Sequence, residues 1–262
     1  MVVVAWIKKS KGGGGPMRGP MGGPMGAPMG PGPQAGTWGP MLVSTLTLGI
    51  DWRARHALHA KLAQLAQSGM TGTKEGRAML LRETVLELLR AEMSWLYVGY
   101  RDLGGHQPQQ AEQQFRAASG EARARFKHEV VRAADGHVMA GQAPGVAARA
   151  TEGEGTVVVT LVVVARRPLR GVNNPRDASE IRAALDDRGS LTADQLVAME
   201  VVWSPSVEDD RLSTSELEQF YPDLLKIDPA SIAGRTFCSY CSGPFPMELL
   251  TCPHCGAPVE RQ

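Results

Sequence analysis

The ten residues 156–165 (TVVVTLVVVA) form a run dominated by β-branched side chains. Such side chains are stiff at χ1 and pack well on a pleated surface. Because the run is apolar at both odd and even positions, it predicts a strand in the middle of a sheet, covered on both faces. A membrane span needs roughly 20 apolar residues, and Arg166-Arg167-Pro168 ends this run at half that length.

Three further segments predict strands that could pair with this one. In residues 42–50, Leu46, Leu48 and Ile50 alternate with Thr and Gly, which indicates a half-buried strand. Residues 95–100 (WLYVGY) are apolar or aromatic at every position but the glycine, and residues 197–203 alternate so that one face is more polar. The sequence therefore predicts a sheet of about four strands.

Helical periodicity fills the segments between the strands. Asp51, Thr73 and Ser119 are predicted N-caps, Pro108 is a predicted helix start, and Asp177 and Ser213 each begin a capping-box pattern. Six helices are predicted. The first three begin after Asp51 (ending by Gly69), after Thr73 (ending at about Glu92) and at Pro108. The last three begin after Ser119 (ending at about Ala133), after Asp177 (ending at Gly189) and after Ser213 (ending by Tyr221). We therefore predict an α+β domain at residues 41–228, with helices packed on a mixed or antiparallel sheet.

Residues 1–40 contrast with this domain. Val2–Ile7 is an apolar run too short for the core of a signal peptide. The following Pro-Met-Gly tetrapeptides bury too little apolar surface to offset their ordering entropy, so we predict a disordered arm. Met17, Met21, Met25 and Met29 recur every four residues and could bind copper through their thioethers, but a flexible low-complexity tail is the commoner meaning of such a tract.

The charge balance and the missing motifs narrow the functional classes. Lys and Arg total 28 against 27 Asp and Glu, so no strong positive field favours nucleic acid, and we expect no nucleic-acid partner. The chain has no Gly-x-Ser-x-Gly elbow, His-Glu-x-x-His helix or phosphate loop, and we assign no catalytic or cofactor-binding residue. The acidic groups at 186–187 and 208–210 are not embedded in apolar sequence of the kind that perturbs catalytic carboxylates, so we do not interpret them as acid–base groups.

Two basic or histidine-containing helix faces are weaker candidates. His56 and His59 lie at i and i+3 and could share a metal, but no carboxylate or Cys accompanies them within that helix. The basic residues from Arg123 to Arg132 could bind RNA or an acidic partner, but Glu121 and Glu129 interrupt them. We interpret both faces as solvated surface.

The order of these segments resembles the domain of unknown function family 1517 over about residues 42–227. The resemblance rests on residues 42–50, 82–90 (RETVLELLR), 157–164, 198–205 (AMEVVWSP) and 212–224, of which 198–205 is the most specific. Members of that family occur in cyanobacteria, plastids and other bacteria, often with a Gly-rich tract and a membrane span before the domain, and no enzymatic activity is assigned to them. This chain keeps the Gly-rich tract, but we expect no membrane span.

The last segment, residues 229–262, predicts a zinc ribbon. Cys238, Cys241, Cys252 and Cys255 form two Cys-x-x-Cys turns separated by ten residues. Two thiolates in one tight turn can face the same ion, and two such turns complete a tetrahedral shell suited to structural Zn²⁺. The alternatives are a redox dithiol, an iron site and disulfides; a dithiol fold would need a βαβ context that 25 residues cannot provide. His254 is expected at the surface and not among the ligands.

These observations favour a non-catalytic scaffold or adaptor in the cytoplasm, with a protein partner of unknown identity. The grouping of the cysteines suits a reducing compartment. Two rival functions remain open: an enzyme whose site is assembled from scattered residues, and a protein that handles copper and zinc.

Overall fold

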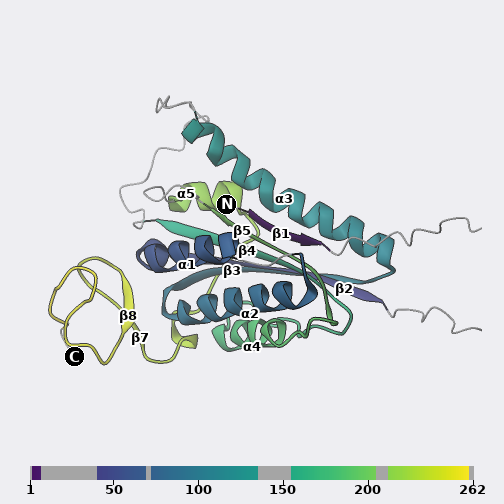
Figure 1. Cartoon of the computed structure of the whole chain (residues 1–262). Coiled ribbons are helices and arrows are strands. Elements are labelled where there is room, and N and C mark those ends of the chain that lie inside the picture. The colour runs from purple at the N-terminus through teal and green to yellow at the C-terminus, as the bar shows by residue number, and fades with distance from the viewer. Residues whose placement is uncertain (1, 7–39, 69–71, 135–154, 205–211, 260–262) are drawn as a thin grey trace, which may run out of the picture.

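The computed structural model describes residues 2–6, 40–68, 72–134, 155–204 and 212–259 (Figure 1). A six-stranded sheet in the order β1-β5-β4-β2-β3-β6 forms its centre, and every neighbouring pair is antiparallel. The strands are β1 (Val2–Trp6), β2 (Met41–Asp51), β3 (Trp95–His106), β4 (Thr156–Ala165), β5 (Leu196–Ser204) and β6 (Leu225–Lys226). The predicted α+β class is confirmed, and the sheet is antiparallel.

Strand β4 lies inside the sheet and is buried at all ten positions. It pairs with β2 from Leu42↔Ala165 to Asp51↔Thr156 and with β5 on its other side. Val159, Leu161, Val163 and Ala165 enter the larger core cluster, whereas Val158, Val162 and Val164 enter two smaller clusters on the opposite face. The prediction of a central strand covered on both faces is therefore confirmed.

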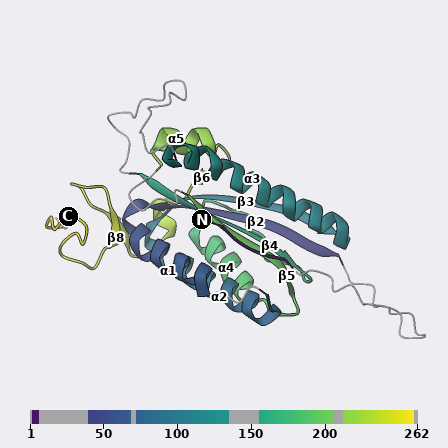
Figure 2. The same cartoon turned by 45° about the horizontal axis from the view of Figure 1, so that its top comes forward.

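Two groups of helices cover the two faces of the sheet (Figure 2). One group packs Leu58, Leu81 and Leu185 on the face of the odd β4 residues, and the other packs Phe115 and Leu217 on the opposite face. The first group is α1 (Arg55–Ser68), α2 (Lys74–Arg90) and α4 (Ala178–Gly189); the second is α3 (Pro108–Ala134) and α5 (Thr214–Phe220). Short 3-10 turns are η1 (Trp52–Ala54), η2 (Glu92–Ser94) and η3 (Pro229–Ser231). Among the described helices, none combines the length and the apolar character that a bilayer crossing requires.

Thr73, Asp177 and Ser213 cap helices as predicted, but one of the two predicted capping boxes is incomplete. Thr73 accepts the N–H of Gly76, and Ser213 forms a complete capping box with Glu216. Asp177 caps α4 through the N–H of Ser179. Its expected partner Glu180 does not reach back to the cap and instead accepts backbone N–H groups from residues 173 and 174.

Three features differ from the sequence-based prediction. The sheet has two strands more than expected, because β6 pairs briefly with β3 and Val2–Trp6 of the predicted disordered arm pairs with β5. The two helices predicted after Pro108 and Ser119 are one helix, α3, of 27 residues. Ser119 is fully buried within α3 and does not cap it, so the chain continues without a break. The Met-rich tract and the acidic group 208–210 lie outside the described residues.

A buried ion pair joins α3 to the sheet. Glu200 on β5 is completely buried, and its two carboxylate oxygens accept hydrogen bonds from the Arg123 guanidinium. This pair raises the pKa of Arg123, chiefly through the hydrogen bond to Glu200. The basic face of α3 is therefore partly a contact with the sheet, and Arg125 likewise contacts Asp223 at 3.0 Å.

We expect Arg123→Met to lower the free energy of unfolding by about 2–3 kcal/mol, because it leaves the buried Glu200 carboxylate without its cation. This is less than the loss of a fully buried pair, since the Arg123 side chain is 41% exposed. Urea unfolding followed by circular dichroism measures the change. The double variant Arg123→Met/Glu200→Met should recover much of the loss, and equal stability of the single and double variants would contradict the prediction.

Candidate metal centre

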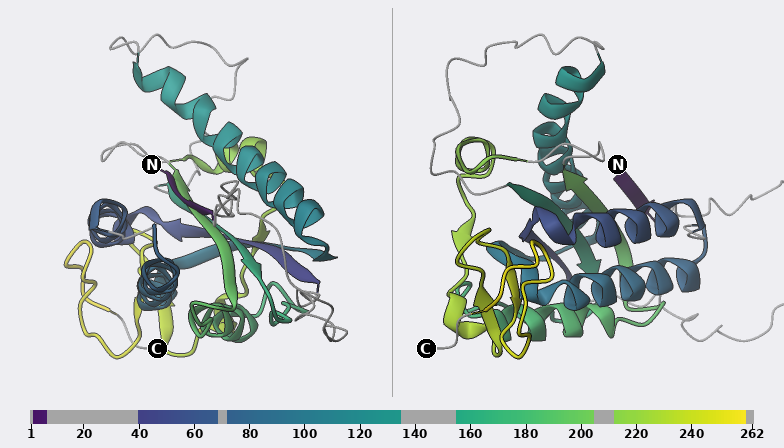
Figure 3. Two further views of the ribbon diagram at one scale, coloured as in Figure 1. Left: turned by 45° about the vertical axis from the view of Figure 1, so that its right-hand side comes forward. Right: turned by 90° about the vertical axis from the view of Figure 1, so that its left-hand side faces the viewer.

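The C-terminal module (residues 229–262) contains a short hairpin and two cysteine turns. Strands β7 (Arg235–Phe237) and β8 (Pro244–Pro246) pair antiparallel as a separate two-stranded sheet. Knuckle 1 (residues 238–241) lies in the connection between these strands, and knuckle 2 (residues 252–255) follows β8. The module lies at one end of the main sheet, beside α1 and α2 (Figure 3).

The two knuckles are closed by the same pair of backbone hydrogen bonds. In each, the N–H after the second cysteine bonds to the carbonyl of the first cysteine, and the N–H of the first cysteine bonds to the carbonyl five residues later. These bonds are Ser242 N to Cys238 O at 2.9 Å, Gly256 N to Cys252 O at 2.9 Å, Cys238 N to Gly243 O at 3.0 Å and Cys252 N to Ala257 O at 2.8 Å. The residue after each knuckle has a left-handed backbone, with φ of 53° at Ser242 and 73° at Gly256.

This geometry brings the four thiols together. The Sγ atoms of Cys238 and Cys255 are 3.7 Å apart, those of Cys241 and Cys252 are 3.8 Å apart, and all four lie within 4.8 Å of one another. A tetrahedral shell with Zn–S bonds of about 2.3 Å separates its sulfurs by about 3.8 Å. All four cysteines are free thiols. Their arrangement is therefore compatible with one metal ion.

The four thiols perturb one another's ionisation. Backbone N–H groups of Cys241 and Tyr240 lower the pKa of Cys238 to about 6. The pKa of Cys255 is raised to about 12: the N–H of Ala257 lowers it, but desolvation and the other three thiols outweigh that effect. Adjacent thiolates repel one another, so the thiols alone cannot all ionise near neutral pH. A divalent cation removes this repulsion and allows four thiolates.

His254 supports knuckle 1 from the outside. Its Nε2 atom lies 2.8 Å from the carbonyl oxygen of Pro244, and its ring packs against Gly243. A Cβ atom at Gly243 would lie 2.6 Å from His254 Cδ2 and 2.9 Å from Arg53 Nε. The side chain at position 243 must therefore be absent for the two knuckles and Arg53 to approach each other.

Two arginines attach the module to the α+β domain. Arg53, in η1, donates to the carbonyl oxygen of Cys241 at 2.6 Å, and its other terminal nitrogen pairs with Asp51 at 3.0 Å. Arg235, in β7, donates to the carbonyl oxygen of Trp95 at 2.6 Å. Neither arginine could be identified from the sequence, because both act on backbone carbonyls of distant segments.

The other candidate residues do not assemble into a site. His56 and His59 gain no third metal-ligating partner, because the four cysteines form the only such group of three or more among the residues described. The His59 ring instead contacts the Trp203 ring edge-on at 6.3 Å. Asp187 pairs with Arg167 at 2.8 Å and accepts the backbone N–H of Arg170, so it organises the segment before α4.

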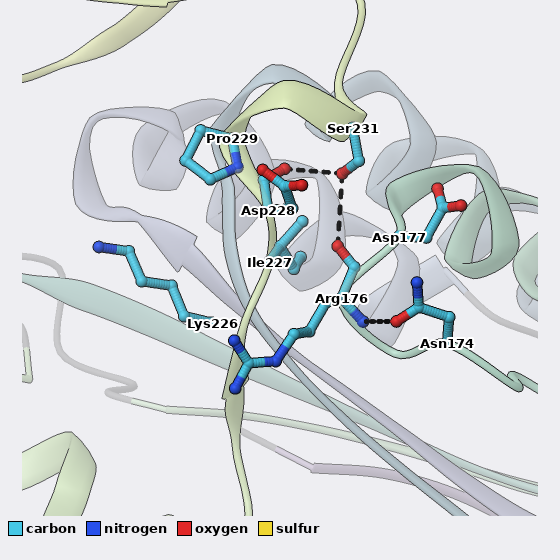
Figure 4. Close-up of a pocket in the computed structure, with 8 residues that line it drawn as sticks. All are labelled: Asn174, Arg176, Asp177, Lys226, Ile227, Asp228, Pro229 and Ser231. Carbon is cyan, nitrogen blue, oxygen red and sulfur yellow. Dashed lines mark hydrogen bonds between the residues drawn. The ribbon is translucent and has the colours of Figure 1, made fainter.

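A pocket of about 510 Å³ lies where the start of α4 meets β6 and η3 (Figure 4). Its carboxylates serve local turns: Asp177 caps α4, and Asp228 caps η3 through the N–H of Ala230. The Ser231 hydroxyl lies 2.7 Å from the carbonyl oxygen of Asp228. The residues that line the pocket include no His or Cys.

Comparison with known proteins identifies the family of the α+β domain. The family described as a protein of unknown function, DUF1517, matches residues 40–227. The chain belongs to the DUF1517 family. The match covers the α+β domain and ends before the cysteine module. No solved structure matches the chain significantly.

Two relatives share most of this domain. Protein FLAP1 homolog A of Synechocystis is 29% identical over 172 residues, which is 64% of this chain and 51% of the relative. FLUCTUATING-LIGHT-ACCLIMATION protein 1, chloroplastic, of Arabidopsis thaliana is 29% identical over 162 residues, which is 61% of this chain and 40% of the relative. The chain thus spans about half the length of these relatives or less. They contradict the prediction of a cytoplasmic location, because the Arabidopsis protein is named as chloroplastic.

We expect Gly243→Ala to disorder the C-terminal module, since the added methyl group would overlap His254 and Arg53. Overpacking of this kind costs about 1–3 kcal/mol. Limited proteolysis should show faster cleavage within residues 235–259 while the α+β domain stays intact. Gly120→Ala is the matched control, because nothing lies within 4 Å of its added Cβ; equal protease resistance of the two variants would refute the packing argument.

Proposed function

We propose that this protein is a non-catalytic scaffold or adaptor whose C-terminal module, held together by one zinc ion, binds a partner protein. Cys238, Cys241, Cys252 and Cys255 are the proposed zinc ligands. The exposed apolar side chains of the module supply the proposed binding surface.

Zinc suits this cluster better than the alternatives. Four thiolates in tetrahedral spacing match structural zinc sites, in which the metal has no open position for a substrate. A disulfide needs sulfurs about 2.05 Å apart, whereas the Sγ atoms of Cys238 and Cys255 are separated by 3.7 Å and those of Cys241 and Cys252 by 3.8 Å. Bound zinc supplies about 10–16 kcal/mol of apparent binding energy to such small modules. The module needs this contribution, because its own core cluster contains only three buried residues.

The observation that carries the docking role is the distribution of exposed apolar side chains. Among the described residues, eight large hydrophobic side chains are exposed, and five of them belong to this short module. These five are Phe237, Tyr240, Met247, Leu249 and Leu250. Tyr240 and Leu250 are each 67% exposed. Aromatic residues and Met are enriched at protein interfaces, so this concentration favours contact with another protein.

Two observations on the α+β domain also support a non-catalytic role. The Arabidopsis relative is named for acclimation to fluctuating light and not for a reaction. In the pocket at α4, the carboxylates of Asp177 and Asp228 and the hydroxyl of Ser231 serve as caps and turn contacts. We therefore propose that this domain presents and supports the zinc module.

Purified protein should contain one zinc per chain, and a strong chelator should unfold the module while the α+β domain stays folded. This follows because zinc binding and folding are coupled in modules of this size. Elemental analysis gives the metal content, and proteolysis with and without chelator locates the loss of structure.

The variant Cys252→Ser should lose the zinc, whereas Ser239→Ala in knuckle 1 should retain it. Iron in place of zinc, or full retention of zinc by Cys252→Ser, would contradict the proposed centre. Copper in addition to zinc would instead support the metal-handling alternative.

We expect Tyr240→Ser/Leu250→Ser to abolish capture of a partner from extracts of the native host while zinc content stays unchanged. Both side chains are mostly exposed, so their loss removes contact surface without removing core. Affinity capture followed by mass spectrometry measures the difference. Met79→Ser/Leu86→Ser on α2 is the matched control, because both residues are exposed apolar side chains outside the module; equal capture by the two variants would refute the docking role.

A further inference from the structure

The two knuckles differ at one position that matters for their geometry. Each turn requires a left-handed residue directly after its second cysteine. Knuckle 2 has Gly256 there, which adopts this conformation without a steric penalty. Knuckle 1 has Ser242, whose Cβ atom approaches a neighbouring carbonyl oxygen in the same conformation. Knuckle 1 therefore needs additional contacts that hold its turn in place.

Arg53 supplies a contact of this kind from the α+β domain. Its terminal nitrogen Nη2 donates to the carbonyl oxygen of Cys241 at 2.6 Å, and this carbonyl belongs to the peptide that joins Cys241 to Ser242. The orientation of that peptide determines both the left-handed turn and the direction of the preceding Cys241 side chain. Arg53 thus acts on the peptide next to a thiol of the cluster.

The guanidinium is itself held firmly. Its Nη1 atom lies 3.1 Å from Oδ1 and 3.0 Å from Oδ2 of Asp51, and Asp51 also accepts the backbone N–H of Arg53 at 3.0 Å. Both side chains are only 8% exposed. The guanidinium also lies over the Trp52 ring, 5.3 Å from its centre. A side chain fixed at this many points loses little further entropy when it binds the carbonyl.

We propose that Arg53 is a positioning residue of the metal centre: it holds the Cys241–Ser242 peptide in its left-handed turn and so directs the Cys241 thiol toward the other three. This inference rests on the proposed zinc site. It adds that the α+β domain completes the centre, because the residue that holds knuckle 1 comes from η1. The positive charge of Arg53 also suits a centre in which four thiolates and Zn²⁺ sum to a formal charge of −2.

Zinc affinity tests this role by competition with a chromophoric chelator, using the full-length protein. Arg53→Met should bind zinc roughly tenfold more weakly, at the lower end of the range for residues that orient metal ligands. Arg53→Lys should fall between Arg53→Met and the unchanged protein, because an ammonium cannot reach Asp51 and the carbonyl with the same planar fork. Arg116→Met is the control, since Arg116 pairs with Glu112 on α3, away from the module.

The decisive variant is Ser242→Gly in the Arg53→Met background. If Arg53 acts by holding a strained turn, glycine removes the strain and should restore most of the lost zinc affinity. If Arg53 only attaches the module to the domain, glycine restores nothing, and the proposal is overturned. Unchanged affinity of Arg53→Met would also overturn it, provided that urea unfolding shows the domain folded.

This experiment separates the proposal from the zinc site on which it rests. Should the unchanged protein fail to bind zinc, the proposed metal centre fails and the role of Arg53 fails with it. Should the unchanged protein bind zinc and Arg53→Met bind it equally well, the metal centre stands and only the role of Arg53 is refuted.

Discussion

The burial of β4 on both faces is the constraint on which the rest of the fold depends. A strand with Val and Leu on both sides loses free energy of stabilisation wherever either face meets water. The chain therefore has to place helices on both sides of the sheet, and it does so with α1, α2 and α4 on one face and α3 and α5 on the other. Three connections follow from this requirement: α1 with α2, α3, and α4 return the chain to β3, β4 and β5, each an antiparallel neighbour of β2 or β4. Helix α5 instead leads to β6, which pairs with β3.

The sequence predicted the parts of this fold that are determined locally. The four long strands and most helix starts were identified from hydrophobic periodicity and capping residues, since these signals act within one element. The continuity of α3 was missed because Ser119-Gly120 resembles a cap and a break. A glycine inside a helix costs only about 1 kcal/mol, and burial of Phe115 and Ala122 against the sheet offsets it. Strands β1 and β6 were missed because such short edge strands depend on their partner strands more than on their own pattern.

Buried charges were the least predictable part of the domain. Residue 200 alternates with apolar neighbours, so the sequence suggested a wetter face, yet Glu200 is completely buried under α3. Its partner Arg123 is 77 residues away in the chain, and no local pattern links the two. Arg188 is also fully buried, where it donates to the hydroxyl oxygen of Ser44 across 144 residues. Only the three-dimensional arrangement explains why these charges are tolerated, because each needs a specific partner in a region of low dielectric.

The cysteine cluster also combines a part that the sequence predicts with a part that it does not. The spacing of the cysteines predicted which thiols would meet, because each Cys-x-x-Cys turn fixes two of them through its own backbone bonds. Arg53 could not be predicted, since it lies 188 residues from the carbonyl that it binds.

The contact between Arg53 and the cysteine module has a consequence for the proposed function. If the module depends on zinc and on Arg53 as proposed, its apolar side chains take up a defined arrangement only when both are in place. The proposed docking surface would then depend on the metal and on the α+β domain as well as on the module itself.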